Sequence, residues 1–191
     1  MIKSHNEWDT LKEVFVGVVE GAHNPDIDKD LHCINYADRD IILNVKEGLY
    51  PKQVIEETQE DLENFVTQLK SFGVSVKRPT PQDQQKYFST PDWRTNGYYN
   101  YCPRDSVLVI GDTIIESPMA LRSRYFETFS FRENFIDYMK DGARWVSAPK
   151  PRLTDDCYQR ENLDELTLTN IEPIFDAANI LRCNNDILYL L

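Results

Sequence analysis

The stretch NYCPRDSVLVIGDTIIESPMALRSRYFE, residues 100–127, decides how this chain folds. It contains two apolar segments, SVLVI and TIIES, on either side of Gly111 and Asp112. A two-residue turn of this kind between β-branched residues is the strongest local signal for a β-hairpin. The segment that follows has apolar residues at helical spacing, and we expect a helix from 120 to 140 that ends before Gly142.

The C-terminal part of the chain repeats this pattern. A strand is expected at residues 143–149, in the sequence ARWVSAP. Two further apolar runs, at 173–182 and 186–191, predict a second hairpin around three turn residues, Cys183, Asn184 and Asn185.

An aspartate stands just before an apolar segment in each unit, Asp105 before SVLVI and Asp176 before ANILR. The chain therefore has a weak internal repeat of strand–strand–helix–strand modules, which indicates an α/β fold. If such modules pack around an axis, the two carboxylates face the same cavity. A single Asp at such a position most often caps a turn. Two at matching positions of a repeat favour a functional site.

The N-terminal part predicts a strand, a long loop and a helix. Residues 11–19, LKEVFVGVV, are expected to form a buried strand in which Gly17 allows a close backbone approach. Residues 20–50 form a long polar connection, and a helix then begins at Pro51 and ends at Gly73. We interpret its apolar stripe as core; it consists of Val54, Ile55, Thr58, Leu62, Phe65, Val66, Leu69 and Phe72.

A short strand follows this helix at residues 74–79. Residues 80–104 are rich in turn-forming and aromatic side chains. Aromatic loops of this kind line pockets or cover a core, and the sequence leaves both interpretations open.

Composition excludes several classes of function. The chain has 191 residues, of which 41% are hydrophobic, enough for one domain with a core. Its formal net charge of −11 disfavours binding to nucleic acid or to anionic membrane surfaces. The N-terminus is polar and no apolar run is long enough to span a membrane, so we expect a cytoplasmic protein.

The four cysteines lie far apart without a CxxC pair, which argues against a zinc site or a disulfide framework; they are Cys33, Cys102, Cys157 and Cys183. The three histidines all fall within the first 32 residues. His32 adjoins Cys33, but neighbouring side chains rarely face each other productively, so we reject a nucleophile pair there.

Four blocks of the sequence resemble the glycine and inosamine-phosphate amidinotransferases. They are SHNEWDTLKEVFVG from residue 4, NYCPRDSVLVIGDTIIESPMALRSRYFE from 100, GARWVSAPKPRL from 142 and EPIFDAANILR from 172. They follow the family's order, although they cover only about the first half of the family's domain. The resemblance implies a partial α/β propeller of pentein type, with residues 1–191 as one domain that is incomplete at its C-terminus.

The resemblance also implies a reaction, the transfer of the amidino group of arginine to an acceptor amine without cofactor or metal. A Cys thiolate attacks the guanidinium carbon, ornithine leaves, and the acceptor attacks the amidino-cysteine. A His moves protons, and the Asp that orients it corresponds to the catalytic Asp176 of FDAA. The Asp that binds the substrate guanidinium corresponds to Asp105 of PRD. Arg122 and Arg124 are weaker candidates for substrate contact, since buried or surface arginines are commonly structural.

Two departures from the family pattern matter. Asn179 stands where the glycine branch often has a second Asp, so the acceptor, glycine or an aminated cyclitol phosphate, stays open. The family's His and Cys lie beyond residue 191, and no cysteine here has the nucleophile's sequence context. The chain ends within an apolar segment, DILYLL. We therefore interpret it as the N-terminal half of a longer protein and expect no activity from it alone.

Two alternative functions are consistent with the same residues. An arginine deiminase-like hydrolase shares the Asp and Cys chemistry, with water in place of the acceptor; the EWD opening and the APKP block favour transfer. A non-catalytic arginine-binding or assembly module would keep Asp105 and need no nucleophile. The expected partners are arginine, an acceptor amine and a second copy in a homodimer.

Overall fold

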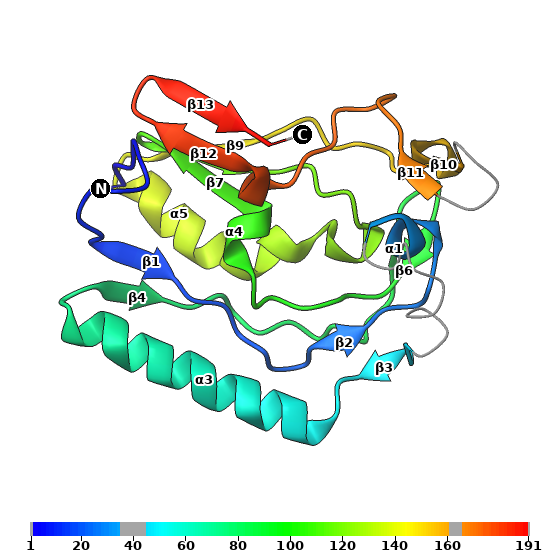
Figure 1. Cartoon of the computed structure of the whole chain (residues 1–191), viewed down its shortest axis with the longest axis horizontal. Helices are drawn as coiled ribbons and strands as arrows, with labels where there is room; N and C mark the ends of the chain where they lie inside the picture. The colour runs from blue at the N-terminus through cyan, green and yellow to red at the C-terminus, as the bar shows by residue number, and fades with distance from the viewer. Residues whose placement is uncertain (1, 35–44, 161–165, 191) are drawn as a thin grey trace.

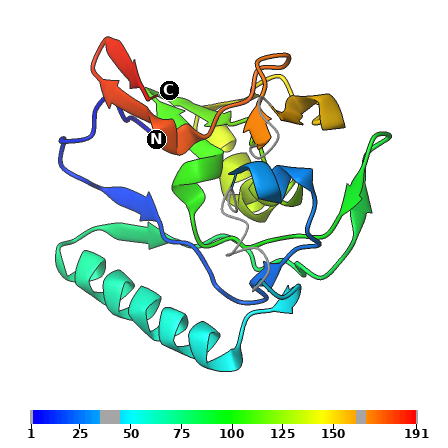
Figure 2. The same cartoon turned by 45° about the vertical axis from the view of Figure 1, so that its right-hand side comes forward.

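The computed structural model describes residues 2–34, 45–160 and 166–190. Its N-terminal unit consists of β1 (Glu13–Phe15), α3 (Lys52–Ser71) and β4 (Ser75–Lys77), with β1 and β4 paired in parallel. Figures 1 and 2 place α3 along one side of the molecule, away from the C-terminal hairpin. The predicted order of strand, loop, helix and strand is confirmed.

The N-terminal strand is shorter than predicted, because regular pairing stops after Phe15. Residues 16–19 are buried, and Val18 forms an isolated bridge to Asn100. The predicted close approach at Gly17 is confirmed: a Cβ at this position would lie 2.2 Å from the carbonyl oxygen of Tyr101.

The connection at 20–50 is not wholly a loop, and this prediction was wrong. It contains β2 (His23–Asn24), paired with β3 (Gly48–Leu49), and the short helix α1 (Lys29–Ile34). Helix α1 buries Asp30 and Leu31, so a long-range packing contact stabilises a segment whose local composition is polar. Residues 35–44 of the connection lie outside the described part.

The apolar stripe of α3 is core only in part. Val66 is buried, but Val54, Phe65 and Phe72 are exposed in the structure. The prediction that the whole stripe is core was therefore wrong for the described residues.

The central unit is a three-stranded sheet in the order β7-β8-β9. The predicted hairpin is confirmed as β7 (Val107–Ile110) and β8 (Thr113–Glu116), and the predicted strand at 143–149 as β9 (Arg144–Ser147), parallel to β8. Below this sheet lies an aromatic core in which Phe15, Phe131 and Phe135 pack edge-to-face or stacked.

The continuous helix predicted at 120–140 is wrong. The segment divides into two 3-10 turns, η1 (Arg122–Arg124) and η2 (Glu127–Phe131), followed by α5 (Arg132–Lys140). Polar contacts prevent a continuous helix here. The backbone N–H of Arg122 donates to Asp30 at 2.7 Å, and the side chains of Arg122 and Arg124 are both bound inside the protein. The predicted end before Gly142 is confirmed, and Gly142 has a φ of 93°.

The aromatic segment contributes both to a second core and to short elements. It forms the hairpin β5 (Phe88–Ser89) and β6 (Arg94–Thr95), and then the helical turn α4 (Pro103–Ser106). Trp93 is buried against Leu153, Cys157 and Tyr158. This core adjoins η3 (Asp155–Cys157) and the pair β10 (Tyr158–Arg160) and β11 (Leu166–Leu168).

The second predicted hairpin is confirmed as β12 (Ile180–Cys183) and β13 (Asp186–Tyr189), with Asn184 in the turn at a φ of 58°. A 3-10 turn, η4 (Ala177–Asn179), precedes it, as α4 precedes β7. The predicted repeat of an aspartate followed by a hairpin therefore has a structural counterpart, and the structure adds a short helical turn beside each aspartate. The two turns contact each other where the two hairpins begin.

Candidate functional site

Asp105 lies in the helical turn α4, which Pro103 opens. Its Oδ2 accepts a hydrogen bond from Nη1 of Arg124 at 2.8 Å. Its side chain is 23% exposed, the most exposed of the side chains in this ion-paired group. Among the described residues, none donates a side-chain hydrogen bond to Oδ1. One carboxylate oxygen is thus held by the protein and the other is open to a ligand.

Asp176 caps η4, and its Oδ1 accepts from the backbone N–H of Ala178 at 3.0 Å. Burial raises the pKa of Asp176, the hydrogen bond from Ala178 opposes that rise, and the negative charge of Asp105 adds to it. The structure thus brings Asp105 and Asp176 within electrostatic reach of each other. Each carboxylate has one oxygen bound to the protein and one without a partner among the described residues.

Arg124 links this pair of carboxylates to the interior. Its Nε and Nη2 donate to Glu127, with 2.8 Å between Nη2 and Oε1, and its side chain is 3% exposed. Its guanidinium also lies over the ring of Tyr99, 4.9 Å from the centroid. Burial alone would lower the pKa of Arg124, but Glu127 and Asp105 outweigh burial and hold the pKa well above its ordinary value.

Arg122 occupies a separate interior site. Its Nη2 donates to the carbonyl of Leu153 at 2.8 Å and to Asp155 at 2.9 Å, while Nη1 donates to Asp28. The sequence suggested both arginines as candidates for substrate contact. In the structure both guanidinium groups are instead buried and bound to carboxylates of the protein.

The sequence did not identify Glu127, Asp28 or Asp155 as partners of the two arginines. A weak signal existed for Glu127, since residues three apart on a helical turn can meet. Asp28 lies 94 residues before Arg122, and no local pattern links them.

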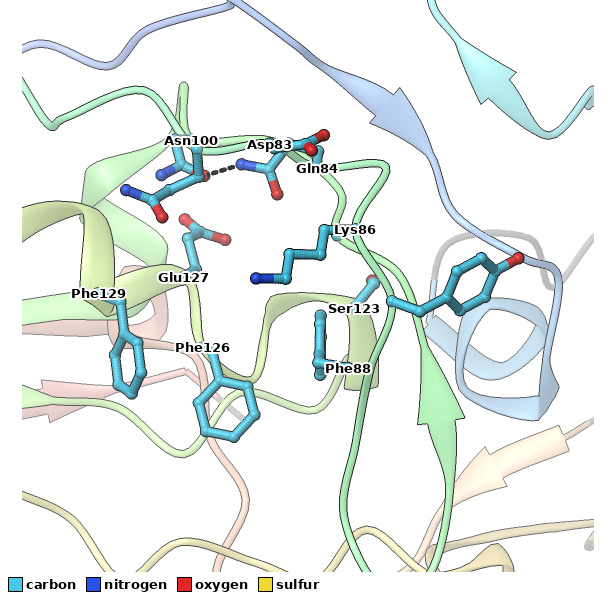
Figure 3. A pocket seen from close by; sticks show the side chains of 12 residues that line it. Asp83, Gln84, Lys86, Phe88, Asn100, Ser123, Phe126, Glu127 and Phe129 are labelled. Carbon is cyan, nitrogen blue, oxygen red and sulfur yellow. Dashed lines mark hydrogen bonds between the residues drawn. The ribbon is translucent and has the colours of Figure 1, made fainter.

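A cavity of about 360 Å³ lies on the other side of Glu127. Figure 3 shows Glu127 and Lys86 reaching into it, with Phe88 and Phe126 on its apolar side. Asn100 also lines it and accepts from Gln84 at 2.6 Å. Neither Asp105 nor Asp176 lines this cavity, so it is distinct from the space in front of the two carboxylates.

Three of the four thiols, those of Cys33, Cys102 and Cys157, have environments that disfavour nucleophilic attack. Burial raises the pKa of Cys33 and of Cys157 to about 11, and burial with the nearby charge of Asp105 raises the pKa of Cys102. A reactive cysteine needs a lowered pKa, because the thiolate is the nucleophile.

Within the described ranges there is no group of His, Cys, Asp and Glu that could hold a metal ion. Nor does any described helix have the length and apolar character required to cross a membrane.

The fold and this carboxylate pair can be compared with known proteins. A scan against models of protein families finds no match. The chain is 46% identical to inosamine-phosphate amidinotransferase 1 of Streptomyces griseus over 191 residues, which is 100% of the chain and 55% of that protein. It is 36% identical to the mitochondrial glycine amidinotransferase of Gallus gallus, covering 96% of the chain and 47% of that protein.

The solved structure of the Streptomyces griseus enzyme matches with a TM-score of 0.92 at 46% identity, over 99% of this chain and 55% of that one. The chain is therefore an α/β protein homologous to the amidinotransferases over its whole length. The identity is higher to the inosamine-phosphate amidinotransferase than to the glycine amidinotransferase. The chain spans about half the length of the curated relatives that it matches.

Proposed function

We propose that this chain carries two carboxylates of an enzyme that moves the amidino group of arginine to an acceptor amine: Asp105, which binds the guanidinium, and Asp176, which orients the proton-transferring imidazole. One observation carries the proposal: Asp105 and Asp176 lie close enough to affect each other electrostatically, and each keeps one oxygen without a partner among the described residues. A planar guanidinium donates several N–H groups in a fixed fork, and the free oxygen of Asp105 can accept from it.

The charges support a cationic ligand. Arg124 and Glu127 largely neutralise each other, and Arg104, which donates to the carbonyl of Ala178 at 3.4 Å, balances only one of the two negative charges of Asp105 and Asp176. Two nearby carboxylates repel each other, and this repulsion contributes to the raised pKa of Asp176. A bound guanidinium would relieve the repulsion, which is a favourable term in binding.

In the proposed reaction a thiolate forms a bond to the guanidinium carbon of arginine, the bond from that carbon to the ornithine nitrogen breaks, and ornithine leaves with a proton. The acceptor amine then attacks the amidino carbon, loses a proton and releases the thiolate. Asp105 would bind the guanidinium and Asp176 would orient the proton-transferring imidazole. We propose that the thiol and the imidazole belong to a segment that corresponds to the part of the relatives not matched by this chain, and that the whole enzyme is a pentein-type propeller.

The acceptor amine is proposed to be an aminated cyclitol phosphate, with glycine as the alternative. The higher identity to the inosamine-phosphate amidinotransferase supports this choice. Asn179, at the position where the glycine branch often has an Asp, also supports it, and its side chain is exposed beside the site at the end of η4. The cytoplasmic location and the homodimer stay predictions.

Isothermal titration of the chain with arginine tests the binding step. We expect Asp105→Asn to weaken arginine binding about tenfold or more, since it removes a charge-assisted partner of the guanidinium. Asp176→Asn should weaken binding less, because it removes only a nearby negative charge. Asp112→Asn is the matched control, because Asp112 is an exposed carboxylate in the turn between β7 and β8, paired with Arg144 of β9. Arginine affinity that is equal in all three variants and the parent would overturn the proposal.

Product analysis tests the transfer step. The gene sequence past codon 191 shows whether a longer polypeptide exists, and that polypeptide is assayed with arginine and each candidate amine. Ornithine and amidinated amine are expected in equal amounts. Citrulline formed without any acceptor would contradict transfer and favour a hydrolase, and arginine binding without ornithine release would favour a non-catalytic module. We expect no ornithine release from the 191 residues alone.

A further inference from the structure

We propose that Arg124 and Glu127 form a positioning pair that fixes how Asp105 presents its carboxylate to a guanidinium ligand. This inference rests on the proposed function, since it assigns Asp105 as the group that contacts the ligand. Arg124 and Glu127 themselves act through Asp105.

The geometry of Arg124 supports a positioning role. Its Nη1 donates to Oδ2 of Asp105 at 2.8 Å, while Nε donates to Oε2 of Glu127 and Nη2 donates to Oε1. A guanidinium held on two of its edges cannot rotate without breaking charge-assisted hydrogen bonds. The orientation of Arg124 therefore dictates which oxygen of Asp105 is held and which faces outward.

Glu127 anchors Arg124 to the rigid part of the fold. Its side chain is 1% exposed, and it lies in η2, which leads into the aromatic core through Phe131. Ser106, the residue after Asp105, donates from its Oγ to Oε1 of Glu127 at 3.4 Å. Glu127 is thus bound to Asp105 by two routes, through Arg124 and through the neighbouring residue of α4.

The side chains of this group become more exposed from Glu127 through Arg124 to Asp105. The side chains of Glu127 and Arg124 are 1% and 3% exposed, and that of Asp105 is 23% exposed. A purely structural ion pair would be complete with Arg124 and Glu127 alone. The third member, Asp105, is the one that a ligand can reach, and Nη1 of Arg124 donates a hydrogen bond to it.

Arg122 provides a matched comparison two residues away. Its side chain is also 3% exposed and also binds two carboxylates, those of Asp28 and Asp155. Within the described part of the chain, neither of these carboxylates has a hydrogen bond or ion pair with Asp105 or Asp176. Replacing either arginine by lysine keeps the charge and removes the planar fork. The two substitutions should therefore cost similar stability and differ in their effect on arginine binding.

The experiment measures arginine affinity by isothermal titration for Arg124→Lys, Arg122→Lys and Asp105→Asn in the full chain, with thermal unfolding to show that each variant is folded. We expect Arg124→Lys to weaken arginine binding about tenfold or more, because misplacement of a binding group by about 1 Å is costly. Arg122→Lys should leave the affinity within about twofold of the parent, within the spread of independent sites.

A double variant separates positioning from general damage. If Arg124 acts through Asp105, Arg124→Lys combined with Asp105→Asn binds arginine as weakly as Asp105→Asn alone, whereas Arg122→Lys adds its small effect independently. Should Arg124→Lys fail to fold, Glu127→Gln takes its place, since it keeps the shape of the side chain and loosens the grip on Arg124.

The outcomes distinguish the two proposals. If Asp105→Asn leaves arginine binding unchanged, the proposed function itself is wrong. If Asp105→Asn weakens binding but Arg124→Lys and Arg122→Lys behave alike, or if the effects of Arg124→Lys and Asp105→Asn add, only the positioning role is overturned.

Discussion

Asp105 and Arg124 are joined by an ion pair of 2.8 Å between Oδ2 and Nη1, across 19 residues of sequence. The pair connects the turn before the central hairpin to the turn after it, so the first repeat unit closes on itself. Because Arg124 also binds Glu127, one buried cation serves two carboxylates of very different exposure.

This arrangement predicts unequal costs for removing the two carboxylates. Glu127→Ala leaves Arg124 buried with only the partly exposed Asp105, and breaking a buried pair in this way costs about 3 to 5 kcal/mol of unfolding free energy. Asp105→Asn keeps an oxygen that accepts from Arg124, and Glu127 still balances the charge, so the expected cost is about 1 kcal/mol. Urea unfolding of both variants measures the difference, and equal losses would contradict the arrangement.

Gly17 gives a prediction about backbone packing. An added Cβ would lie 2.2 Å from the carbonyl oxygen and 2.3 Å from the Cα of Tyr101, which are backbone atoms that cannot rotate away. We expect Gly17→Ala to cost about 3 kcal/mol of unfolding free energy by overpacking. Gly142→Ala is the control, since nothing lies within 4 Å of its Cβ and only its φ of 93° opposes the change, at about 1 kcal/mol. Losses of the same size from both would contradict the close approach.

The sequence predicted the parts of the fold that depend on neighbours in the chain. The turns at Gly111 and Asn184, the end of a helix before Gly142 and the alternation of the hairpins all follow from local rules. The matching places of Asp105 and Asp176 followed from the repeat, and the contact between α4 and η4 agrees with it.

The sequence could not predict what depends on distant partners. The helix expected at 120–140 is broken at its start because Arg122 binds Asp30 and Asp28, which lie 92 and 94 residues earlier. The same contacts turn part of a polar segment into α1. Local propensity is a weak prior that tertiary contacts override, and here buried charges supply those contacts.

The aromatic core under the central sheet gives a prediction about stability. Phe135 is 1% exposed and packs against Phe15, Phe131 and Trp145. We expect Phe135→Ala to cost about 3 to 5 kcal/mol, from lost burial and the cavity that remains. Phe72→Ala is the control, because Phe72 is 82% exposed and its loss should change stability by about 0.5 kcal/mol or less. Chemical unfolding of both variants measures this, and a large loss from Phe72→Ala would show that this side chain is covered in solution.

Asp30 gives a prediction about pH. Burial raises the pKa of Asp30 from 3.8 to about 6, against the opposing effect of the hydrogen bond from the backbone of Arg122. The folded protein thus binds this proton more tightly than the unfolded chain does. The stability that protonated Asp30 provides is full below about pH 3.8 and is lost as the pH rises through about 6.

Asp30→Asn should therefore imitate the protonated form at every pH. We expect the variant and the parent to be similarly stable near pH 4, and the variant to be more stable at pH 7.5 by about 2 to 3 kcal/mol, from a shift of about two pKa units. Asp112→Asn is the control: its exposed partner Arg144 lowers the pKa of Asp112, so this substitution should bring no gain at neutral pH. Unfolding free energies measured by urea titration at both pH values decide the matter, because a constant difference between Asp30→Asn and the parent would mean that Asp30 does not titrate in this range.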